Sequence, residues 1–111
     1  MVYVTQEQEG KNLIPALKYG ELTVLVSSST QVGFSAGQVT REIDAKLSNF
    51  NDEDYLLLIG DPIIIGIAIA MAGKWNQGRV KVLKWDRQEH VYYPVSLNFF
   101  EKGESNGTKF S

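Results

Sequence analysis

The sequence predicts a small α/β domain built on an open sheet with a parallel β-α-β core, and three patterns carry this prediction. Short apolar segments rich in Val, Leu and Ile are typical of buried strands. One longer segment has the apolar spacing of an amphipathic helix, and another is apolar nearly all round. Two segments around a short polar turn indicate an antiparallel hairpin that ends in an edge strand. The expected strands are residues 21–28, 54–60, 79–86 and 90–100, and the expected helices are residues 35–49 and 62–75.

The N-terminal residues give the weakest patterns. Residues 1–5 are β-prone and predict a short strand at an edge of the sheet. Residues 11–20 are interrupted by Pro15 and end at Gly20, which indicates an irregular loop or a single helical turn. The strand around Leu22–Val26 has apolar residues on both faces, so we expect it in the centre of the sheet.

The helix at residues 35–49 is indicated by a start signal and one apolar stripe. Ser35 and Gln38 have the spacing of a capping box, in which each side chain satisfies a free amide of the first turn. We expect this helix to cross on the right-handed path from residues 22–26 to residues 55–59, which would be parallel neighbours. The stripe consists of Val39, Ile43, Leu47 and Phe50.

The segment Tyr55–Gly73 carries a single charge, Asp61, and raises the question of a membrane span. Asp61 and Pro62 divide it into two parts, each too short to cross a bilayer. Asp61 can accept hydrogen bonds from the free amides of a helix start, and Pro62 fits the first helical position. We therefore favour a buried strand, a tight turn and a buried helix, with a membrane-associated protein as an alternative.

The C-terminal hairpin turns at the polar residues 87–89. Pro94 lacks an amide hydrogen and therefore places the second hairpin strand at an edge of the sheet. Beyond residue 100 the sequence is polar. We expect one domain over residues 1–100 and a flexible tail over residues 101–111.

The composition excludes several kinds of site. The chain has 111 residues, of which 43% are hydrophobic and 22% charged, and a formal net charge of -2. This balance argues against a nucleic-acid partner, which favours a basic excess. Cysteine is absent and His90 is the only histidine, so thiolate and two-histidine metal sites are excluded. We predict no metal and no cofactor. Because the N-terminus lacks the pattern of a secretory signal, we also predict a cytoplasmic location.

One candidate ligand site follows from the expected topology. Ligands of open parallel sheets bind beyond the carboxyl ends of the strands, where two of the loops would meet. Hydroxyls and helix-start amides in these loops could bind an anion, but the glycines match neither the dinucleotide fingerprint nor the P-loop. A serine-rich turn and an ordinary helix cap explain the same residues. The candidate ligand-binding residues are Ser27, Ser28, Ser29, Thr30, Ser35, Gly60 and Asp61.

Two surfaces are candidates for protein contacts. A strip of small residues along the second helix either packs on the sheet or meets another subunit. At the hairpin, aromatic side chains are interleaved with charges, as at protein interfaces; core aromatic residues beside a charged turn are the other interpretation. The candidate interface residues are Gly66, Ala70, Gly73, Trp85, Arg87 and Tyr92.

The segments GDP, IGIA, LKWDRQE and YYPV lie within residues 51–99. On these segments the chain resembles small uncharacterised proteins of tailed phages, including T7-like phages of marine cyanobacteria. The resemblance implies no catalytic residue, and it implies expression inside a bacterial host.

We therefore hypothesise a non-catalytic, phage-type accessory protein that acts through protein contacts as a homodimer, with a host or phage protein as a further partner. The runner-up is a small nucleotide- or phosphate-binding enzyme that uses the loops after the first two predicted strands. Neither nucleic acid nor membrane is the expected partner.

Overall fold

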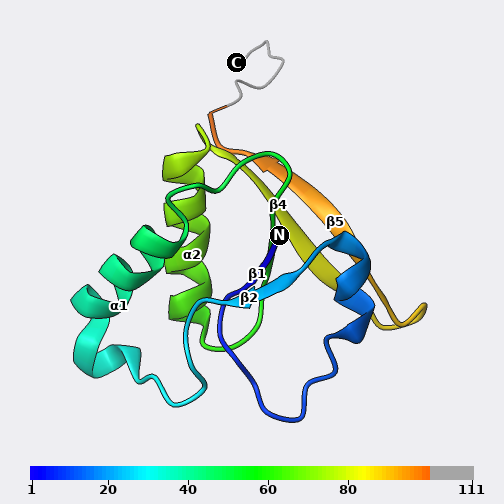
Figure 1. Cartoon of the computed structure of the whole chain (residues 1–111), viewed down its shortest axis with the longest axis horizontal. Helices are drawn as coiled ribbons and strands as arrows, with labels where there is room; N and C mark the ends of the chain where they lie inside the picture. The colour runs from blue at the N-terminus through cyan, green and yellow to red at the C-terminus, as the bar shows by residue number, and fades with distance from the viewer. Residues whose placement is uncertain (101–111) are drawn as a thin grey trace, which may run out of the picture.

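The chain folds into one mixed sheet with two α-helices on the same face (Figure 1). The computed structural model describes residues 1–100, and the expected tail at residues 101–111 lies outside them. The elements are β1 (Val2–Val4), the 3-10 helix η1 (Ile14–Tyr19), β2 (Leu22–Val24), α1 (Val32–Lys46), β3 (Tyr55–Leu57), α2 (Pro62–Trp75), β4 (Arg79–Asp86) and β5 (Val91–Asn98). The strand order is β2-β1-β3-β4-β5, and only β4 and β5 pair antiparallel. The predicted fold class, with a parallel core and an antiparallel edge strand, is confirmed.

The direction of the strand crossings explains why α1 and α2 share a face. From β1 the chain moves outward to β2, then returns past β1 to β3 and continues to β4. Right-handed crossovers that run in opposite directions lie on opposite faces of a sheet. Accordingly, α1 and α2 cover one face and η1 packs against the other (Figure 1).

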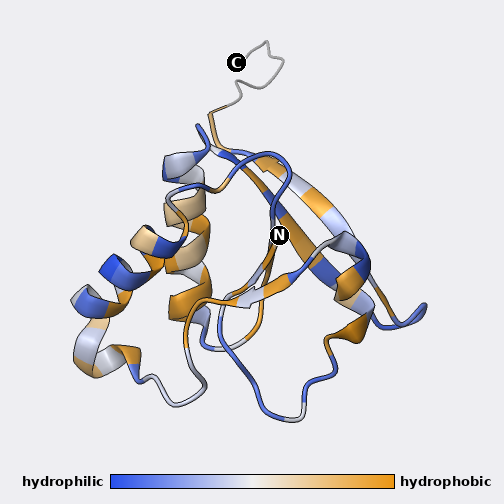
Figure 2. Ribbon diagram, in the orientation of Figure 1, coloured by the Kyte–Doolittle hydropathy of each residue, from blue (hydrophilic) through white to orange (hydrophobic). Residues whose placement is uncertain are grey.

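Each face of the sheet has its own apolar core. On the helix face, the predicted stripe of α1 is buried together with Ile64, Ala68 and Ala72 of α2. On the η1 face, Ala16 packs with buried side chains of β1, β3 and β4. Figure 2 shows apolar residues along most of α2, whereas the outer side of α1 beyond its first turn is mainly hydrophilic. Burial of one Val, Leu or Ile side chain contributes about 1.5 to 3 kcal/mol, so these two cores are the main source of stability.

The N-terminal strand lies in the interior of the sheet and not at its edge. Val2 and Val4 of β1 are fully buried on the η1 face. On the helix face, the ring of Tyr3 packs against that of Phe50 with centroids 5.9 Å apart. Because β1 pairs with β2 on one side and with β3 on the other, the expectation of an edge strand at residues 1–5 is wrong.

The edge position belongs instead to β2. β1 lies between β2 and β3, so residues 22–26 and 55–59 are not neighbours, and the expected central pair is wrong. Leu25 and Val26 are buried although they follow β2, and the Leu25 amide donates to the Val4 carbonyl at 2.9 Å. Their contacts with the helix-face core explain why this segment is apolar on both sides.

The helix α1 begins before the predicted start at Ser35. Gln31 is the N-cap residue, and its side chain makes no capping hydrogen bond. Ser35 has a non-helical φ of -148° and ψ of 36°, and its hydroxyl donates to the Gln31 carbonyl at 3.3 Å. Ser35 and Gln38 form no hydrogen bond in the described part of the chain, so the predicted capping box is not formed. Ser35 marks a kink in α1, and its hydroxyl bonds back to the preceding turn.

The strand, turn and helix predicted for residues 54–75 are confirmed. Asp61 is the N-cap residue of α2, and its Oδ1 accepts from the Ile63 amide at 2.8 Å. Pro62 occupies the first turn, where the absence of an amide hydrogen costs nothing. Within residues 1–100, every helix is too short or too polar to pass through a bilayer.

The helix α2 ends in a left-handed turn. The Gly78 amide donates to the Gly73 carbonyl at 2.7 Å, which is the hydrogen bond of a Schellman motif. Gln77 has a φ of 57° at the position that glycine usually fills in this motif. A side chain in the left-handed region costs about 1 kcal/mol or more, so the end of α2 carries local strain.

Replacing Gln77 by glycine should relieve this strain. We expect Gln77→Gly to raise the free energy of unfolding by about 0.5 to 1 kcal/mol, after the greater freedom of glycine in the unfolded chain is subtracted. Gln77→Ala is the matched control, because it removes the same amide group but keeps a Cβ at positive φ. Urea denaturation measures both variants, and equal stabilities of the two would contradict this explanation.

Candidate functional site

The winding of the sheet reverses between β1 and β3, and the loops predicted to bind a ligand meet at this point. The connections that leave β1 and β3 run in opposite directions across the sheet. A crevice at the carboxyl ends of such strands is the usual ligand site of open α/β sheets. The structure brings residues 27–30 and 60–61 together there. It adds Gln6 from the loop after β1, a residue that no local sequence pattern predicted.

The side chain of Gln6 occupies this crevice. Its Nε2 donates to the Ser27 carbonyl at 3.1 Å, and its Oε1 accepts from the Asp61 amide at 2.8 Å. Only 6% of Gln6 is exposed. Gly60 has a φ of +103°, and a Cβ there would lie 2.5 Å from Gln6 Oε1, so this close approach requires glycine. One buried carboxamide therefore joins the three loops.

Thr5 makes a similar contact one residue earlier in the chain. Thr5 is fully buried, and its hydroxyl accepts from the Ile59 amide at 2.8 Å. The same hydroxyl is within hydrogen-bond distance of the carbonyls of Leu57 and Ile59. Thr5 thus satisfies backbone groups of the chain just beyond the end of β3, where ladder pairing with β1 stops.

The donors that could bind an anion at this edge are engaged within the protein. The Ser27 hydroxyl forms hydrogen bonds with the hydroxyls of Ser29 and Thr30 at 3.2 and 3.0 Å. At the start of α2, one amide is held by Gln6 and another by the Asp61 carboxylate. A phosphate here would have to displace these internal partners.

The remaining candidates at this edge do not improve the anion site. Ser28 lines an open hollow of about 530 Å³ with Gln6, Glu7, Gln8 and Glu9, and the two carboxylates oppose a phosphate group. The Ser35 hydroxyl donates to the carbonyl of Gln31, the N-cap residue of α1, and has no hydrogen bond to residues 60–61 among the described residues. Within residues 1–100, no group of three or more acidic or histidine side chains is arranged to hold a metal ion.

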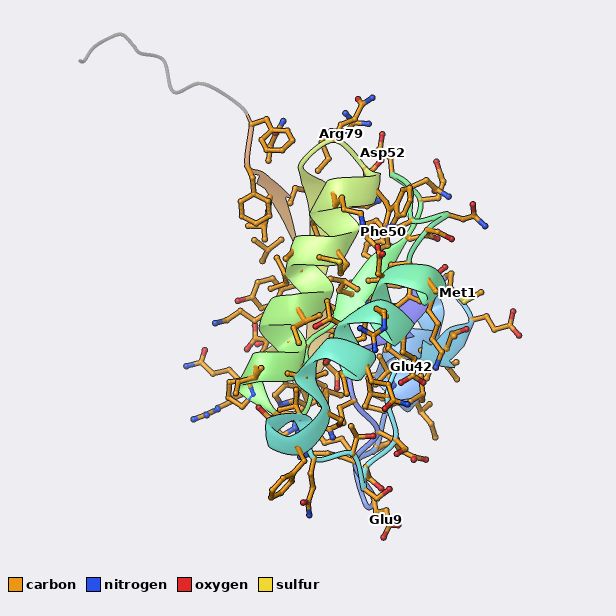
Figure 3. All side chains as sticks on the ribbon, turned by 90° about the vertical axis from the view of Figure 1, so that its left-hand side faces the viewer. Met1, Glu9, Glu42, Phe50, Asp52 and Arg79 are labelled. Atoms are coloured by element: carbon orange, nitrogen blue, oxygen red, sulfur yellow. The ribbon has the colours of Figure 1, made fainter. Side chains whose placement is uncertain are left out.

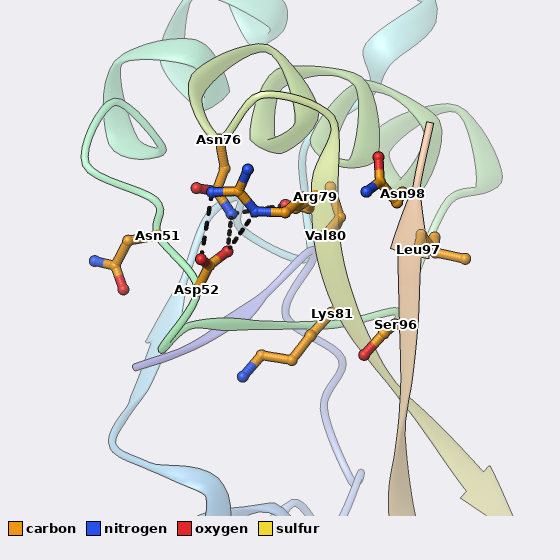
Figure 4. Close-up of a pocket in the computed structure, with 9 residues that line it drawn as sticks. All are labelled: Asn51, Asp52, Asn76, Arg79, Val80, Lys81, Ser96, Leu97 and Asn98. Atoms are coloured by element: carbon orange, nitrogen blue, oxygen red, sulfur yellow. Dashed lines mark hydrogen bonds and ion pairs between the residues drawn. The ribbon is translucent and has the colours of Figure 1, made fainter. Parts of the chain in front are cut away.

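A polar pocket of about 440 Å³ lies at the opposite end of the sheet, where β4 begins (Figure 4). Figure 3 shows Asp52 and Arg79 at this end of the molecule and Glu9 at the other. Arg79 Nε and Nη2 donate to Asp52 Oδ1 and Oδ2 at 3.0 and 3.3 Å. Asn76 Nδ2 donates to the same Oδ1 at 2.9 Å and to the Arg79 carbonyl at 2.8 Å.

The hydrogen bonds of the polar pocket have an electrostatic consequence. Those from Arg79 and then Asn76 lower the pKa of the Asp52 carboxyl below its ordinary value. They tie the loop before β3 to the end of α2 and the start of β4. No sequence pattern predicts this ion pair, because Asp52 and Arg79 lie in separate elements that are far apart in the chain.

The predicted strip on α2 divides between surface and interior. Gly66 and Ala70 are exposed, and a Cβ at Gly66 would meet no atom within 4 Å. Gly73 is buried, with Val80 and Phe99 in ordinary contact with its Cβ position. α2 packs on the core through other residues, so Gly66 and Ala70 do not form the surface that meets the sheet.

The aromatic candidates at the hairpin also differ from one another. Trp85 and Tyr92 are direct partners in the β4–β5 ladder, and their rings meet edge to face at 4.8 Å. Tyr92 is 4% exposed and belongs to the η1-face core, whereas Trp85 is 38% exposed. Arg87 is exposed in the turn. In the Trp85–Tyr92 pair, Tyr92 is therefore fixed in the core while the ring of Trp85 remains accessible.

Comparison with known proteins identifies the family. The family model described as phage Pam3 gp32-like protein matches residues 1–99. This match covers most of the chain, so the chain belongs to that family. The resemblance to small phage proteins predicted from residues 51–99 is confirmed, and it extends to the N-terminus. No curated protein and no solved structure matches the chain significantly.

Removing the Gln6 side chain tests its role at the crevice. We expect Gln6→Ala to lower the free energy of unfolding by about 1 to 3 kcal/mol, because the Asp61 amide and Ser27 carbonyl lose a partner in a largely buried place. The control is Gln8→Ala, an exposed residue of the same loop. Denaturation with urea gives both values, and equally small effects of the two variants would show that Gln6 does not join the loops.

The Asp52 network should make part of the stability depend on pH. The folded-state pKa of Asp52 is below the unfolded value of about 3.9, so its contribution is present above that value and is lost as the pH falls through the folded-state pKa. Asp52→Asn should therefore lose less stability than the wild type between pH 6 and pH 3. Glu53→Gln, at an exposed neighbour, is the control. Urea denaturation at both pH values gives the comparison, and identical pH dependence of wild type and Asp52→Asn would refute it.

Proposed function

We propose that this member of the phage Pam3 gp32-like family is a non-catalytic interaction protein that works as a homodimer in the cytoplasm of the host cell. The observation that supports this most is an apolar part of α2 that faces outward. Ile63 is 58% exposed, and Gly66 and Ala70 are also exposed. We call Ile63, Gly66, Ile67 and Ala70 the α2 face.

The α2 face differs from the outer surface of the neighbouring helix. On α1, apart from Phe34 in the first turn, which is 90% exposed, the exposed positions include Arg41, Glu42 and Lys46, as is usual where a helix meets water. The members of the α2 face are three or four residues apart and therefore adjoin one another on the helix. Three of the four are exposed and Ile67 is half-buried; an adjoining apolar set of this kind is typical of an interaction surface.

A second copy of the chain is the partner that suits this face. Gly66 and Ala70 are small and lie about one turn apart, so another helix could approach the α2 backbone closely. A twofold axis through the face would set α2 against the same helix of the second copy, with identical residues on both sides. Its 14 residues give a contact about 21 Å long. The formal net charge of -2 on each chain opposes this pairing only weakly.

The apolar surface continues from α2 toward the end of β5. A hollow of about 410 Å³ is lined by Ile69, Ala70, Gly73, Phe99 and Phe100, among others. The two phenylalanines are 54% and 72% exposed. Exposed aromatic side chains often act as anchors in protein interfaces. This hollow gives a dimer partner, or a further phage or host protein, a place to bind beside the α2 face.

The alternatives have less support. A nucleotide- or phosphate-binding enzyme would use the loops at residues 27–30 and 60–61, whose donors are engaged with one another and with Gln6. A membrane span would rely on α2, whose 14 residues fall short of the roughly 20 that cross a bilayer.

Size-exclusion chromatography with light scattering tests the homodimer. We expect the wild type to have twice the 12.4 kDa mass of one chain at micromolar concentration and above. Gly66→Arg should be monomeric, because the long charged side chain would lie within the interface. It should remain folded, since its Cβ meets no atom within 4 Å and leaving glycine favours the helix by up to about 1 kcal/mol.

The matched control is Gly33→Arg, which makes the same change at a helical glycine of α1 whose Cβ position is also open. It should leave the dimer intact. A wild-type mass of one chain at all concentrations would contradict the homodimer. A Gly66→Arg variant that stays dimeric would show that the α2 face is not the interface.

A further inference from the structure

The strands β3 and β4 separate at their carboxyl ends. Their pairing consists of Leu56 with Val82 and Leu57 with Leu83, and β4 continues to Asp86 after β3 has ended. Beyond the last pair, a hollow of about 320 Å³ opens between the two chain segments. It lies at the carboxyl end of a parallel pair, where α/β sheets bind ligands. Gln6 does not line this hollow, so it remains open although the crevice beside β1 is filled.

A second hollow of about 490 Å³ adjoins the first. The loop at residues 10–12 and Pro15 form one side of it, and Trp85, His90 and Tyr92 of the hairpin form the other. Lys11, Trp85 and Tyr92 line both hollows, so the two adjoin at these side chains. We call the two hollows together the aromatic cleft. The volume of each is in the range of small-molecule sites.

Trp85 is a fixed and accessible wall of the aromatic cleft. Its ring lies edge to face with buried Tyr92 at 4.8 Å and with His90 at 6.1 Å. Among the described residues, the Trp85 indole N–H has no hydrogen-bond partner, whereas that of Trp75 donates to Asp44 Oδ1 at 2.7 Å. Trp85 can therefore offer both a ring for stacking and a hydrogen-bond donor to a ligand.

The charges that line the aromatic cleft are of one sign. They are Lys11 and Lys84, and no carboxylate side chain lines either hollow. Neither lysine forms an ion pair with a residue in the described part of the chain. In a protein with a net charge of -2, this is a local cationic environment next to an aromatic wall. It is complementary to a negatively charged ligand.

We propose that the aromatic cleft binds a small molecule in which an aromatic ring carries an anionic group. The ring would stack on Trp85, and the anion would pair with Lys11, which lines both hollows; Lys84 adjoins Trp85 in β4 and therefore points to the other face of the sheet. A mononucleotide and an aromatic carboxylate share this chemistry, and the experiment below separates them. The proposal does not depend on the homodimer, since the cleft and the α2 face have no residue in common.

Nuclear magnetic resonance of the two indole N–H groups tests the site in the intact chain. The Trp75→Phe variant lacks one of the two indole ¹H–¹⁵N signals and thereby assigns both. The signals of the wild type are then followed while adenosine 5′-monophosphate or indole-3-acetate is added. We expect at least one of these two ligands to shift the Trp85 signal in a saturable way. The one that binds more tightly shows whether the cleft favours a mononucleotide or an aromatic carboxylate. Adenosine alone and inorganic phosphate alone should bind at least tenfold more weakly, because each supplies half of the interaction. The Trp75 signal, held by Asp44, should not move and serves as the internal control.

Two variants locate the contacts. Lys11→Gln should weaken binding by about tenfold at the Trp85 signal, and it changes only an exposed loop residue and should not affect folding. Trp85→Leu should weaken binding to a similar extent; because it lacks the reporting indole, its affinity is measured by isothermal titration calorimetry beside the wild type. Lys18→Gln is the control, because Lys18 lies on η1 and does not line the cleft. An unshifted Trp85 signal with millimolar concentrations of both ligands would overturn the proposal. So would equal shifts of both tryptophan signals, or a Lys11→Gln variant that binds as tightly as Lys18→Gln.

Discussion

The buried side chain of Gln6 is the interaction on which the rest of the arrangement depends. It joins the loops that follow β1, β2 and β3, and each of these loops leads into a different crossover. The backbone groups that it satisfies would otherwise lack partners in a place with little access to water, which is costly. Together with Thr5, Gln6 allows polar backbone to be buried at the point where open α/β sheets usually hold a ligand.

Because Gln6 fills this crevice, a ligand or a protein partner would have to bind at other surfaces. The α2 face lies on the helix side of the sheet, and Trp85 and Tyr92 of the aromatic cleft lie on the η1 side. A dimer formed through α2 would therefore leave the cleft accessible to a ligand. The Asp52–Arg79–Asn76 network, at the far end of the strands, is internally satisfied and serves to position the loop before β3.

Local patterns in the sequence predicted much of the fold. The α1 stripe, the Asp61 cap of α2 and the hairpin were all confirmed, because each depends on residues close together in the chain. The order of β1 and β2 was not predictable from such patterns, since it depends on contacts such as that between Tyr3 and Phe50. Gln6 was missed for the same reason: its partners lie in loops far along the chain. Ser35 was misassigned because its hydroxyl bonds backward to Gln31 instead of forward.

Native-state hydrogen exchange at two loop amides tests most directly whether the crevice is closed. The amides of Ile59 and Asp61 lie outside regular structure and donate to the side chains of Thr5 and Gln6. If the crevice is closed as described, they should be protected to the same order as the Thr5 amide, which donates to the Leu57 carbonyl. Exchange of Ile59 and Asp61 as fast as that of the exposed Glu9 amide would mean that the crevice opens readily to solvent, and would contradict the account.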